Sequence, residues 1–187
     1  GLTPLLRRRM VGRMSRARLP PPELARLFVG LLPEEEVRDA LLRHVRAWHW
    51  PVTAVPTRRG RLHLTLHFLG VLPREAIAGL VQRLAVPFEP CELRLERPAV
   101  WRGEHAVICP QAVPAALMAL HARLQRALAG AVAVPSRWQP HVTLARHARD
   151  ARPPTGPVCI RWPVEGYVLV ESDLRPPPSY RVVAAYP

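Results

Sequence analysis

The sequence predicts an α+β fold with two similar lobes of antiparallel sheet, helices on the outer faces and a central groove. Two observations lead to this prediction. Short apolar runs typical of strands outnumber the segments with helical periodicity, and the helices are interspersed among them. The pattern His-x-Thr also occurs twice, at His63 and at His141, each time inside such a run. We therefore expect each lobe to bring one motif to a shared groove.

The elements of the first half follow from local signals. The first predicted element is an apolar strand at 26–33. Pro33 and three glutamates then start a helix over 33–50, because anions are favoured at the positive end of a helix dipole. The first motif strand at 61–70 follows, and a second helix at 73–85 begins with a proline.

The second half repeats this alternation. Strands are predicted at 88–97 and 104–110, with a glycine turn between them, and a helix at 113–130. The remaining predicted elements are the second motif strand at 138–147, a proline-rich loop at 151–157, and two closing strands at 164–174 and 180–187.

Length and composition fit one domain with a substantial core. The chain has 187 residues, 49% of them hydrophobic, and a net charge of +13. Every Lys+Arg position is arginine, which is consistent with a GC-rich coding bias. That bias does not explain the excess of cations over anions, which favours a phosphate-bearing partner.

Residues 1–25 are predicted to form a basic N-terminal arm, and residues 26–187 a single bilobal domain. Six arginines cluster in the arm, and the run LPPPE ends any helix there. A solvated tail without function is the simpler interpretation of the arm, and binding of nucleic acid is the alternative.

Three widely spaced cysteines, Cys91, Cys109 and Cys159, form no Cys-x-x-Cys pair. This argues against a disulfide scaffold and a zinc ribbon and favours a reducing cytoplasm. No apolar run reaches the roughly 18–20 residues of a membrane span, and no signal peptide is predicted. We expect a cytoplasmic monomer that does not bind membranes.

The motif strands carry polar side chains on an otherwise apolar element. In RLHLTLHFLG, alternation places His63, Thr65 and His67 on one face and the apolar side chains on the other, namely Leu62, Leu64, Leu66 and Phe68. The run WQPHVTLARH repeats the pattern with His141 and Thr143. One such motif usually marks only a half-exposed strand. Two similar copies indicate a shared site.

Two facing imidazoles suit acid–base chemistry near neutral pH. One neutral ring can take a proton from water while a protonated ring gives one to a leaving oxygen. Threonine hydroxyls on the same face can donate to phosphate oxygens. On a strand, His63 and His67 would be roughly 13 Å apart, too far to share one ion. We therefore expect no metal and no cofactor, and the sequence also lacks serine-hydrolase and P-loop patterns.

The runs HLTLHFLG and PHVTLAR, with their spacing, resemble the paired signatures of the 2H phosphoesterase superfamily. Within it, residues 26–187 most resemble the RNA 2′,3′-cyclic phosphodiesterases, also called 2′-5′ RNA ligases. The resemblance implies hydrolysis of a 2′,3′-cyclic phosphate at an RNA end to a 2′-phosphate. It implies that His63 and His141 are the catalytic pair, and that Thr65, Thr143 and Arg146 bind the phosphate.

Two features of this assignment stay open. Strand alternation alone would put Arg146 on the apolar side, so a bulge or strand end must turn it into the groove. The resemblance suggests that His141 activates the water and His63 protonates the leaving 3′ oxygen, but the two motifs are so alike that the reverse order is also compatible. Alternation leaves His67 facing the groove, and Trp138 is the best candidate to stack a base.

Three alternatives concern the substrate and the reaction. The same site could join a cyclic phosphate to a 5′-hydroxyl, which is 2′-5′ RNA ligation. A 2H enzyme could instead act on a small cyclic nucleotide or on ADP-ribose cyclic phosphate. A non-catalytic RNA-binding module would be expected to have lost one motif residue, and all four are present. The basic charge favours RNA as the partner.

Overall fold

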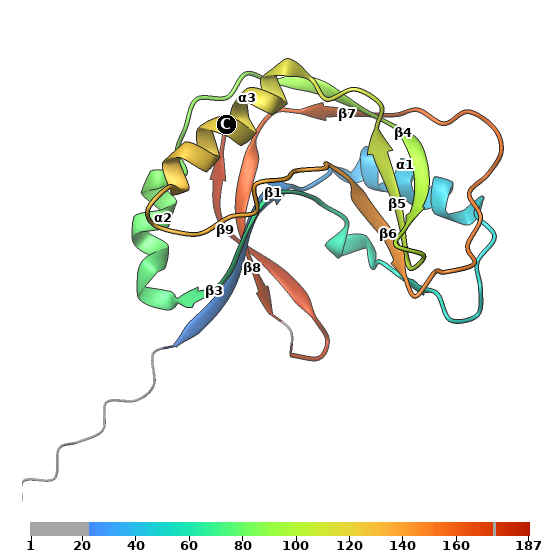
Figure 1. The fold of residues 1–187 in the computed structure, drawn as a ribbon, viewed down its shortest axis with the longest axis horizontal. Coiled ribbons are helices and arrows are strands. Elements are labelled where there is room, and N and C mark those ends of the chain that lie inside the picture. Colours follow the sequence, from blue (N-terminus) through green and yellow to red (C-terminus); the bar gives the residue numbers. More distant parts are fainter. Residues whose placement is uncertain (1–22, 174) are drawn as a thin grey trace, which may run out of the picture.

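The computed structural model describes residues 23–173 and 175–187, which form a curled antiparallel sheet with helices packed against it (Figure 1). The strand order is β7-β4-β5-β6-β3-β1-β8-β9, and β2 pairs with β6. The strands are β1 (Leu24–Leu31), β2 (Val55–Pro56), β3 (Leu64–Pro73), β4 (Cys91–Trp101), β5 (His105–Pro110), β6 (Val142–Arg146), β7 (Ile160–Val164), β8 (Tyr167–Asp173) and β9 (Ser179–Tyr186). The helices are α1 (Glu35–Arg46), α2 (Ile77–Arg83) and α3 (Ala115–Leu128), with short 3₁₀ turns η1 (Arg59–Arg61) and η2 (Arg74–Ala76).

Strands β3 and β6 lie together in the middle of the sheet and divide it into two lobes. Strands β1, β8 and β9 continue the sheet beyond β3, and β5, β4 and β7 continue it beyond β6. This matched arrangement confirms the predicted bilobal α+β fold.

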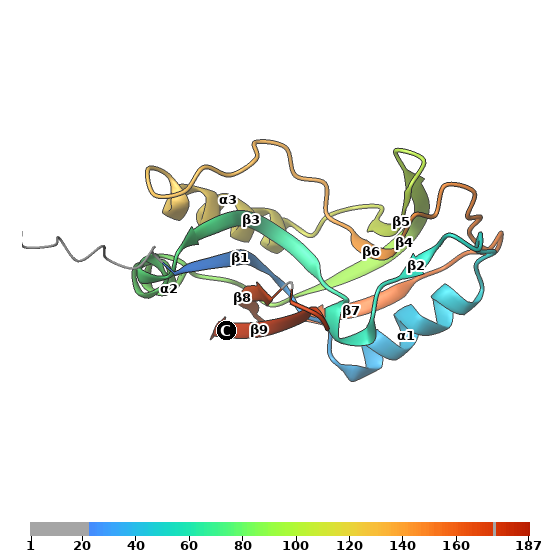
Figure 2. The same ribbon diagram turned by 90° about the horizontal axis from the view of Figure 1, so that it is seen from below.

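Helices α1 and α3 connect the lobes by crossing between them. Helix α1 follows β1 in the chain but contacts β7 of the other lobe, and α3 follows β5 but contacts β3 (Figure 2). One hydrophobic cluster includes buried side chains from both lobes, such as Leu27 and Leu95. The two lobes on either side of the groove therefore share one continuous hydrophobic core.

Several predicted boundaries shift. The first strand begins at Leu24 rather than at residue 26, whereas residues 1–22 of the predicted arm lie outside the described residues. The first helix ends at Arg46 and not at Trp50. Beyond the helix end, the ring of Trp48 stacks on Trp50, with ring centroids 5.0 Å apart and an interplanar angle of 11°.

Strand β7 was not predicted. Its sequence IRWPV contains Pro163, which lacks the N–H that an interior strand donates to its ladder. The strand lies at the edge of the sheet and pairs only with β4, where Pro163 stands opposite Glu92. An edge strand tolerates proline because one side of its backbone has no ladder partner.

Within residues 23–173 and 175–187, the helices are all too short or too polar to span a membrane.

Gly30 allows β1 to pack closely against the first motif strand. It stands opposite Thr65, and a Cβ atom at this position would lie 2.6 Å from the carbonyl oxygen of Leu64. Backbone atoms cannot move aside as a flexible side chain can. The position therefore requires glycine for space rather than for its backbone angles.

We predict that Gly30→Ala lowers the free energy of unfolding by about 1–3 kcal/mol, because the added methyl group overpacks the strand pair. Urea denaturation measures this change. Gly79→Ala, in α2, is the matched control, since nothing lies within 4 Å of its Cβ position and alanine favours helix. Equal stability of Gly30→Ala and wild type would contradict the close approach.

Candidate active site

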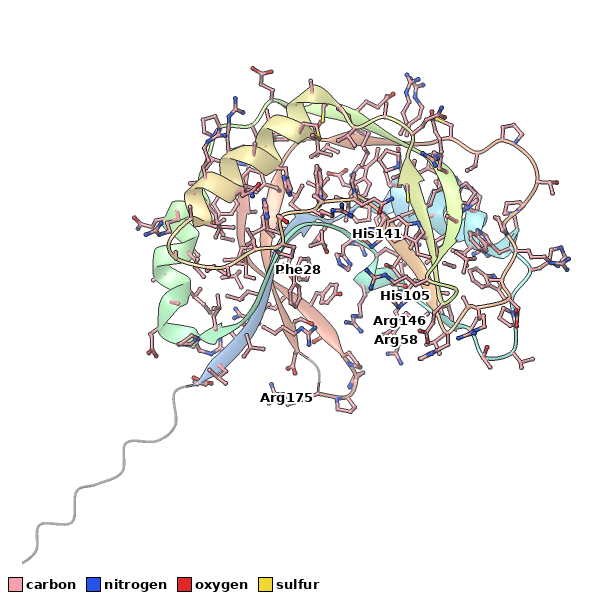
Figure 3. The ribbon with its side chains drawn as sticks, in the orientation of Figure 1. Phe28, Arg58, His105, His141, Arg146 and Arg175 are labelled. Atoms are coloured by element: carbon pink, nitrogen blue, oxygen red, sulfur yellow. The ribbon has the colours of Figure 1, made fainter. Side chains whose placement is uncertain are left out.

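The two motif strands meet at one backbone pair. Leu64 of β3 lies opposite Val142 of β6 in antiparallel register. This register brings His63 next to Thr143, and Thr65 next to His141, across the join between the lobes. In Figure 3 the side chain of His141 lies between the two halves of the sheet. The four residues that sequence analysis selected are thus brought together.

The sequence had placed both histidines inside the motif strands. In the structure each histidine directly precedes its strand, since β3 begins at Leu64 and β6 at Val142. The Nδ1 atom of His63 lies 2.8 Å from the carbonyl oxygen of Arg61, and that of His141 lies 2.8 Å from the carbonyl oxygen of Gln139. A carbonyl only accepts, so Nδ1 carries the proton in each ring. In each neutral ring, Nε2 is therefore the nitrogen without a proton and the one that can accept a proton.

The two strands share a backbone irregularity that turns their ends. Burial along β6 runs buried, half-buried, buried, buried, exposed, and the first five residues of β3 show the same order. The pairing of β6 with β5 shifts by one residue at Leu144, and that of β3 with β1 shifts at Leu66. Such a shift is typical of a β-bulge, which re-aims the following side chains.

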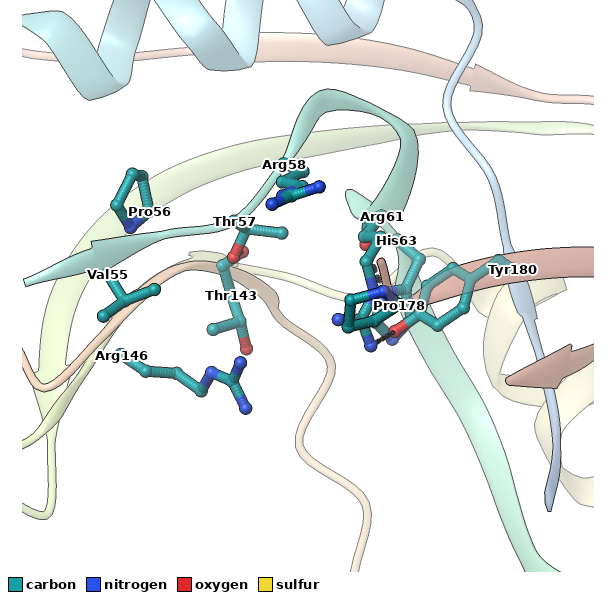
Figure 4. A pocket seen from close by; sticks show the side chains of 10 residues that line it. All are labelled: Val55, Pro56, Thr57, Arg58, Arg61, His63, Thr143, Arg146, Pro178 and Tyr180. Carbon is teal, nitrogen blue, oxygen red and sulfur yellow. Dashed lines mark hydrogen bonds between the residues drawn. The ribbon is translucent and has the colours of Figure 1, made fainter. Parts of the chain in front are cut away.

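The bulge in β6 places Arg146 on the same side as Thr143, and both line one pocket (Figure 4). This resolves the conflict between simple alternation and the position that the family resemblance implied. The bulge in β3 has the matching effect on Phe68. Alternation predicted an apolar, buried Phe68, but its ring is 42% exposed and lies 5.1 Å below the guanidinium of Arg26.

The pocket beside His63 is basic. It has a volume of about 370 Å³ and no Asp or Glu lines it. Its polar lining comprises Thr57, Arg58, Arg61, His63, Thr143, Arg146 and Tyr180. His141 borders a neighbouring hollow of about 940 Å³ together with Trp101, His105 and Trp138. The pair of histidines therefore stands between two depressions, and Thr65 lines neither.

Aromatic rings surround both candidate histidines. His63 contacts Phe28 and Tyr180, with ring centroids 4.8 and 5.2 Å away, and His141 contacts Trp101 at 4.5 Å. Burial among these rings is the main cause that lowers the pKa of His63, and the charges of His141 and Arg61 lower it further. Burial likewise lowers the pKa of His141, with a contribution from His105. Without substrate, both rings are therefore mainly neutral at pH 7.

The hydroxyl of Thr65 is coupled to the protonation of His63. Its Oγ1 atom lies 3.1 Å from Nε2 of His63. When the ring is neutral, Nε2 can only accept, so the threonine hydroxyl donates to it. When the ring is protonated, Nε2–H donates instead, and the hydroxyl proton is free for another acceptor.

Residues 33–171 match the sequence profile of the 2′-5′ RNA ligase superfamily. The chain belongs to this superfamily. It is 33% identical to a Thermus thermophilus protein named RNA 2′,3′-cyclic phosphodiesterase, with 86% of this chain and 89% of that protein covered. The predicted membership of the 2H phosphoesterases is confirmed.

Solved structures of the superfamily share the fold. E. coli LigT complexed with 3′-AMP is 25% identical, with a TM-score of 0.77 and coverage of 87% of this chain and 97% of LigT. A crystal structure of a Thermus thermophilus protein is 31% identical, with a TM-score of 0.70 and coverage of 86% of this chain and 96% of that protein.

The structure contradicts one expectation and leaves another untested. His67 does not face the groove, because it is 2% exposed and its Nε2 atom lies 2.9 Å from the carbonyl oxygen of His121. The prediction that Trp138 stacks a base stays a prediction, since Trp138 lines the hollow beside His141 and has one ring face occupied within the protein. One face stacks on His121, with ring centroids 4.1 Å apart and an interplanar angle of 10°.

These three rings support the motifs from behind. The ring of His121 stacks between His67 and Trp138, at 4.1 Å from each. The indole N–H of Trp138 donates to the carbonyl oxygen of Thr65 over 3.0 Å. The stack thereby connects α3 and the segment before His141 to the first motif strand.

Sequence reasoning missed four polar pocket residues, Thr57, Arg58, Arg61 and Tyr180. The run TRRGR directly before the first motif was a visible signal for the arginines. Tyr180 lies more than a hundred residues from the motif, and only the pairing of β9 with β8 brings it near His63. In the described residues, no cluster of three or more His, Cys, Asp or Glu side chains is arranged to hold a metal ion.

We predict that acid weakens the fold through the buried stack. Burial lowers the pKa of His121 from 6.5 to about 4, and the charge of His67 adds to this. Between these values the unfolded chain binds a proton that the folded chain does not. The free energy of unfolding therefore falls as the pH falls through this window, by at most about 1.4 kcal/mol per pH unit for one histidine.

His121→Phe keeps an aromatic ring in the stack and removes the titrating group. Urea unfolding of the variant across the same pH range should show a smaller slope of stability against pH than wild type. An unchanged slope would mean that His121 does not enter the fold as a neutral ring.

Proposed function

We propose that this chain hydrolyses 2′,3′-cyclic phosphate ends of RNA to 2′-phosphate ends, without a metal, through His63 and His141. The observation that carries the proposal is the antiparallel pair of Leu64 and Val142, which gathers two imidazoles and two threonine hydroxyls. The arginine-lined pocket beside them suits a phosphate ligand. A relative named RNA 2′,3′-cyclic phosphodiesterase supports RNA as the substrate.

Proton transfer is divided between the two rings. Neutral His141 accepts a proton from water through Nε2 as the water oxygen attacks phosphorus. The bond between phosphorus and the 3′ oxygen breaks, and protonated His63 gives its Nε2 proton to that oxygen. The products are a 2′-phosphate and a 3′-hydroxyl. Exchange with solvent restores both rings.

The contact between His63 and Thr65 supports this order of roles. In the free protein the Thr65 hydroxyl lies 3.1 Å from Nε2 of neutral His63. When substrate binds and the protonated Nε2–H turns to the leaving 3′ oxygen, that hydroxyl can donate to a phosphate oxygen. The bound anion in turn favours the imidazolium, which offsets the burial that lowers the pKa of His63 in the free protein. With an RNA 5′-hydroxyl in place of water as the attacking group, the same proton transfers would break the bond to the 3′ oxygen and form a 2′-5′ linkage.

Thr65, Thr143 and Arg146 hold the reacting phosphate and meet the charge that grows on its oxygens. These groups supply hydrogen bonds and charge rather than the transferred proton, so their contribution is electrostatic and positional. Arg146 can bind two phosphate oxygens with its planar fork.

The first functional test is the dependence of the rate on pH, measured on a cyclic-phosphate RNA end in the presence of EDTA. Burial lowers the pKa of both histidines from 6.5, so the bell-shaped profile of kcat/KM should be centred on the acid side of 6.5. Bound phosphate raises the pKa of the imidazoles, so the profile of kcat should lie at higher pH.

His63→Ala and His141→Ala should each reduce kcat by about 10²–10⁴-fold. His49→Ala, at an exposed position outside both depressions, is the control. Near wild-type turnover in either motif variant, or loss of wild-type activity with EDTA, contradicts the two-histidine mechanism.

The second functional test separates phosphate binding from proton transfer. Thr143→Val keeps the side-chain shape, removes one donor and should reduce the rate by about 10²–10³-fold. Arg146→Lys keeps the charge, loses the fork and should also be slower. The pH–rate profiles of both variants should keep the apparent pKa values of wild type, since neither residue carries the transferred proton.

Thr53→Val is the matched control, because the Thr53 hydroxyl is bonded to the carbonyl oxygen of His147 and does not line the pocket. Undiminished rates in both Thr143→Val and Arg146→Lys would place the phosphate elsewhere.

A further inference from the structure

The pocket contains more positive charge than a cyclic phosphate needs. Arg58, Arg61 and Arg146 all line it, and within residues 23–173 and 175–187 none of them has a carboxylate within 4.0 Å. A 2′,3′-cyclic phosphate is a diester with one negative charge. Three guanidinium groups around a single monoanion would leave two of them without a counter-charge.

The adjacent residues Arg58 and Arg59 differ in their ion pairs. Arg59 turns back to α1, where its guanidinium pairs with Glu35 and with Asp39. Arg58, one residue earlier, lines the pocket and is exposed, with no such carboxylate pair among the described side chains. The fold therefore neutralises one arginine of the run and leaves its neighbour available to a ligand.

The guanidinium of Arg61 is positioned by Tyr180 and has no ion pair with a carboxylate of the described residues. Its guanidinium lies over the ring of Tyr180, 4.7 Å from the centroid, and one terminal nitrogen is 3.4 Å from the tyrosine hydroxyl. Its Nε atom is buried and has no hydrogen-bond partner among the described residues. A buried donor without a partner is unfavourable, so a ligand that supplies an acceptor to this guanidinium would stabilise the arrangement.

Arg58 and Arg61 line the same pocket as His63, so they can contact a part of the substrate next to the reacting phosphate. Arg61 is two residues before His63, and its carbonyl oxygen orients that ring. The volume of about 370 Å³ is within the range of small-ligand sites and exceeds the needs of one phosphate group. In RNA, the closest second anion to a terminal cyclic phosphate is the phosphodiester that joins the terminal nucleotide to the one before it.

We propose that Arg58 and Arg61 form a second phosphate subsite, which binds the phosphodiester one nucleotide upstream of the reacting end. The subsite rests on the proposed function, since it assumes that the cyclic phosphate reacts at the two histidines. It selects RNA ends over cyclic mononucleotides, because a mononucleoside cyclic phosphate has no upstream phosphodiester to offer. Arg146 remains with the reacting phosphate.

The test compares a dinucleotide ending in a 2′,3′-cyclic phosphate with the matching mononucleoside 2′,3′-cyclic phosphate. The quantity measured is the ratio of their kcat/KM values. In Arg58→Gln this ratio should fall by about 10-fold, the size expected for a lost charge-assisted hydrogen bond. Arg61→Gln should lower the ratio in the same direction.

A second readout is salt dependence. The logarithm of kcat/KM for the dinucleotide falls with the logarithm of salt concentration, and the slope should become shallower by about 0.7 in Arg58→Gln, as for one lost phosphate contact on a single strand. Arg126→Gln controls for the loss of one positive charge, because Arg126 is exposed on α3 and lines neither depression. It should leave both ratio and slope unchanged.

Three results would overturn the subsite. Equal losses on both substrates in Arg58→Gln would assign Arg58 to the reacting phosphate. Unchanged kcat/KM values on both substrates in Arg58→Gln and in Arg61→Gln would remove the two arginines from binding. Arg137 lines the hollow beside His141. A fall in the ratio only in Arg137→Gln would mean that the upstream phosphodiester binds in that hollow and not in the pocket beside His63. Failure of the wild type to hydrolyse either substrate would instead overturn the proposed function itself.

Discussion

The antiparallel pairing of Leu64 with Val142 is the constraint on which the candidate site depends. It is the contact at which the motif strands of the two lobes join, and its register sets which histidine stands beside which threonine. A shift by one residue would move the polar side chains to the opposite face, since strand side chains alternate. The crossed helices and the continuous core hold that register. Gly30 lets β1 support it closely from the other side of β3.

The electrostatics of the groove are arranged for an anion that the protein itself does not provide. Aromatic walls and burial lower the pKa of both candidate histidines, and no carboxylate lines the pocket to oppose this effect. Carboxylates elsewhere neutralise other arginines, as Glu171 does for Arg74 and Arg181. A phosphate entering the pocket would favour the imidazolium, so binding and protonation are coupled.

Behind the groove, a second set of histidines has a structural role. His67 and His121 form a stack with Trp138 that is buried from solvent on the histidine side. Residue type alone does not separate these rings from the candidate pair, because His67 and His63 occupy the same short segment. The bulge at Leu66 separates them, since it turns His67 into the core while His63 stays at the groove.

The sequence by itself determined the paired motifs, the superfamily, the alternation of strands and helices and the basic character of the ligand site. These are local or compositional properties, so periodicity and spacing carry them. The tertiary structure alone decided where Arg146 and Phe68 point, that β7 completes one edge, and that Tyr180 reaches His63. Bulges and cross-lobe contacts depend on the pairing of segments far apart in the chain, and no local pattern encodes that register.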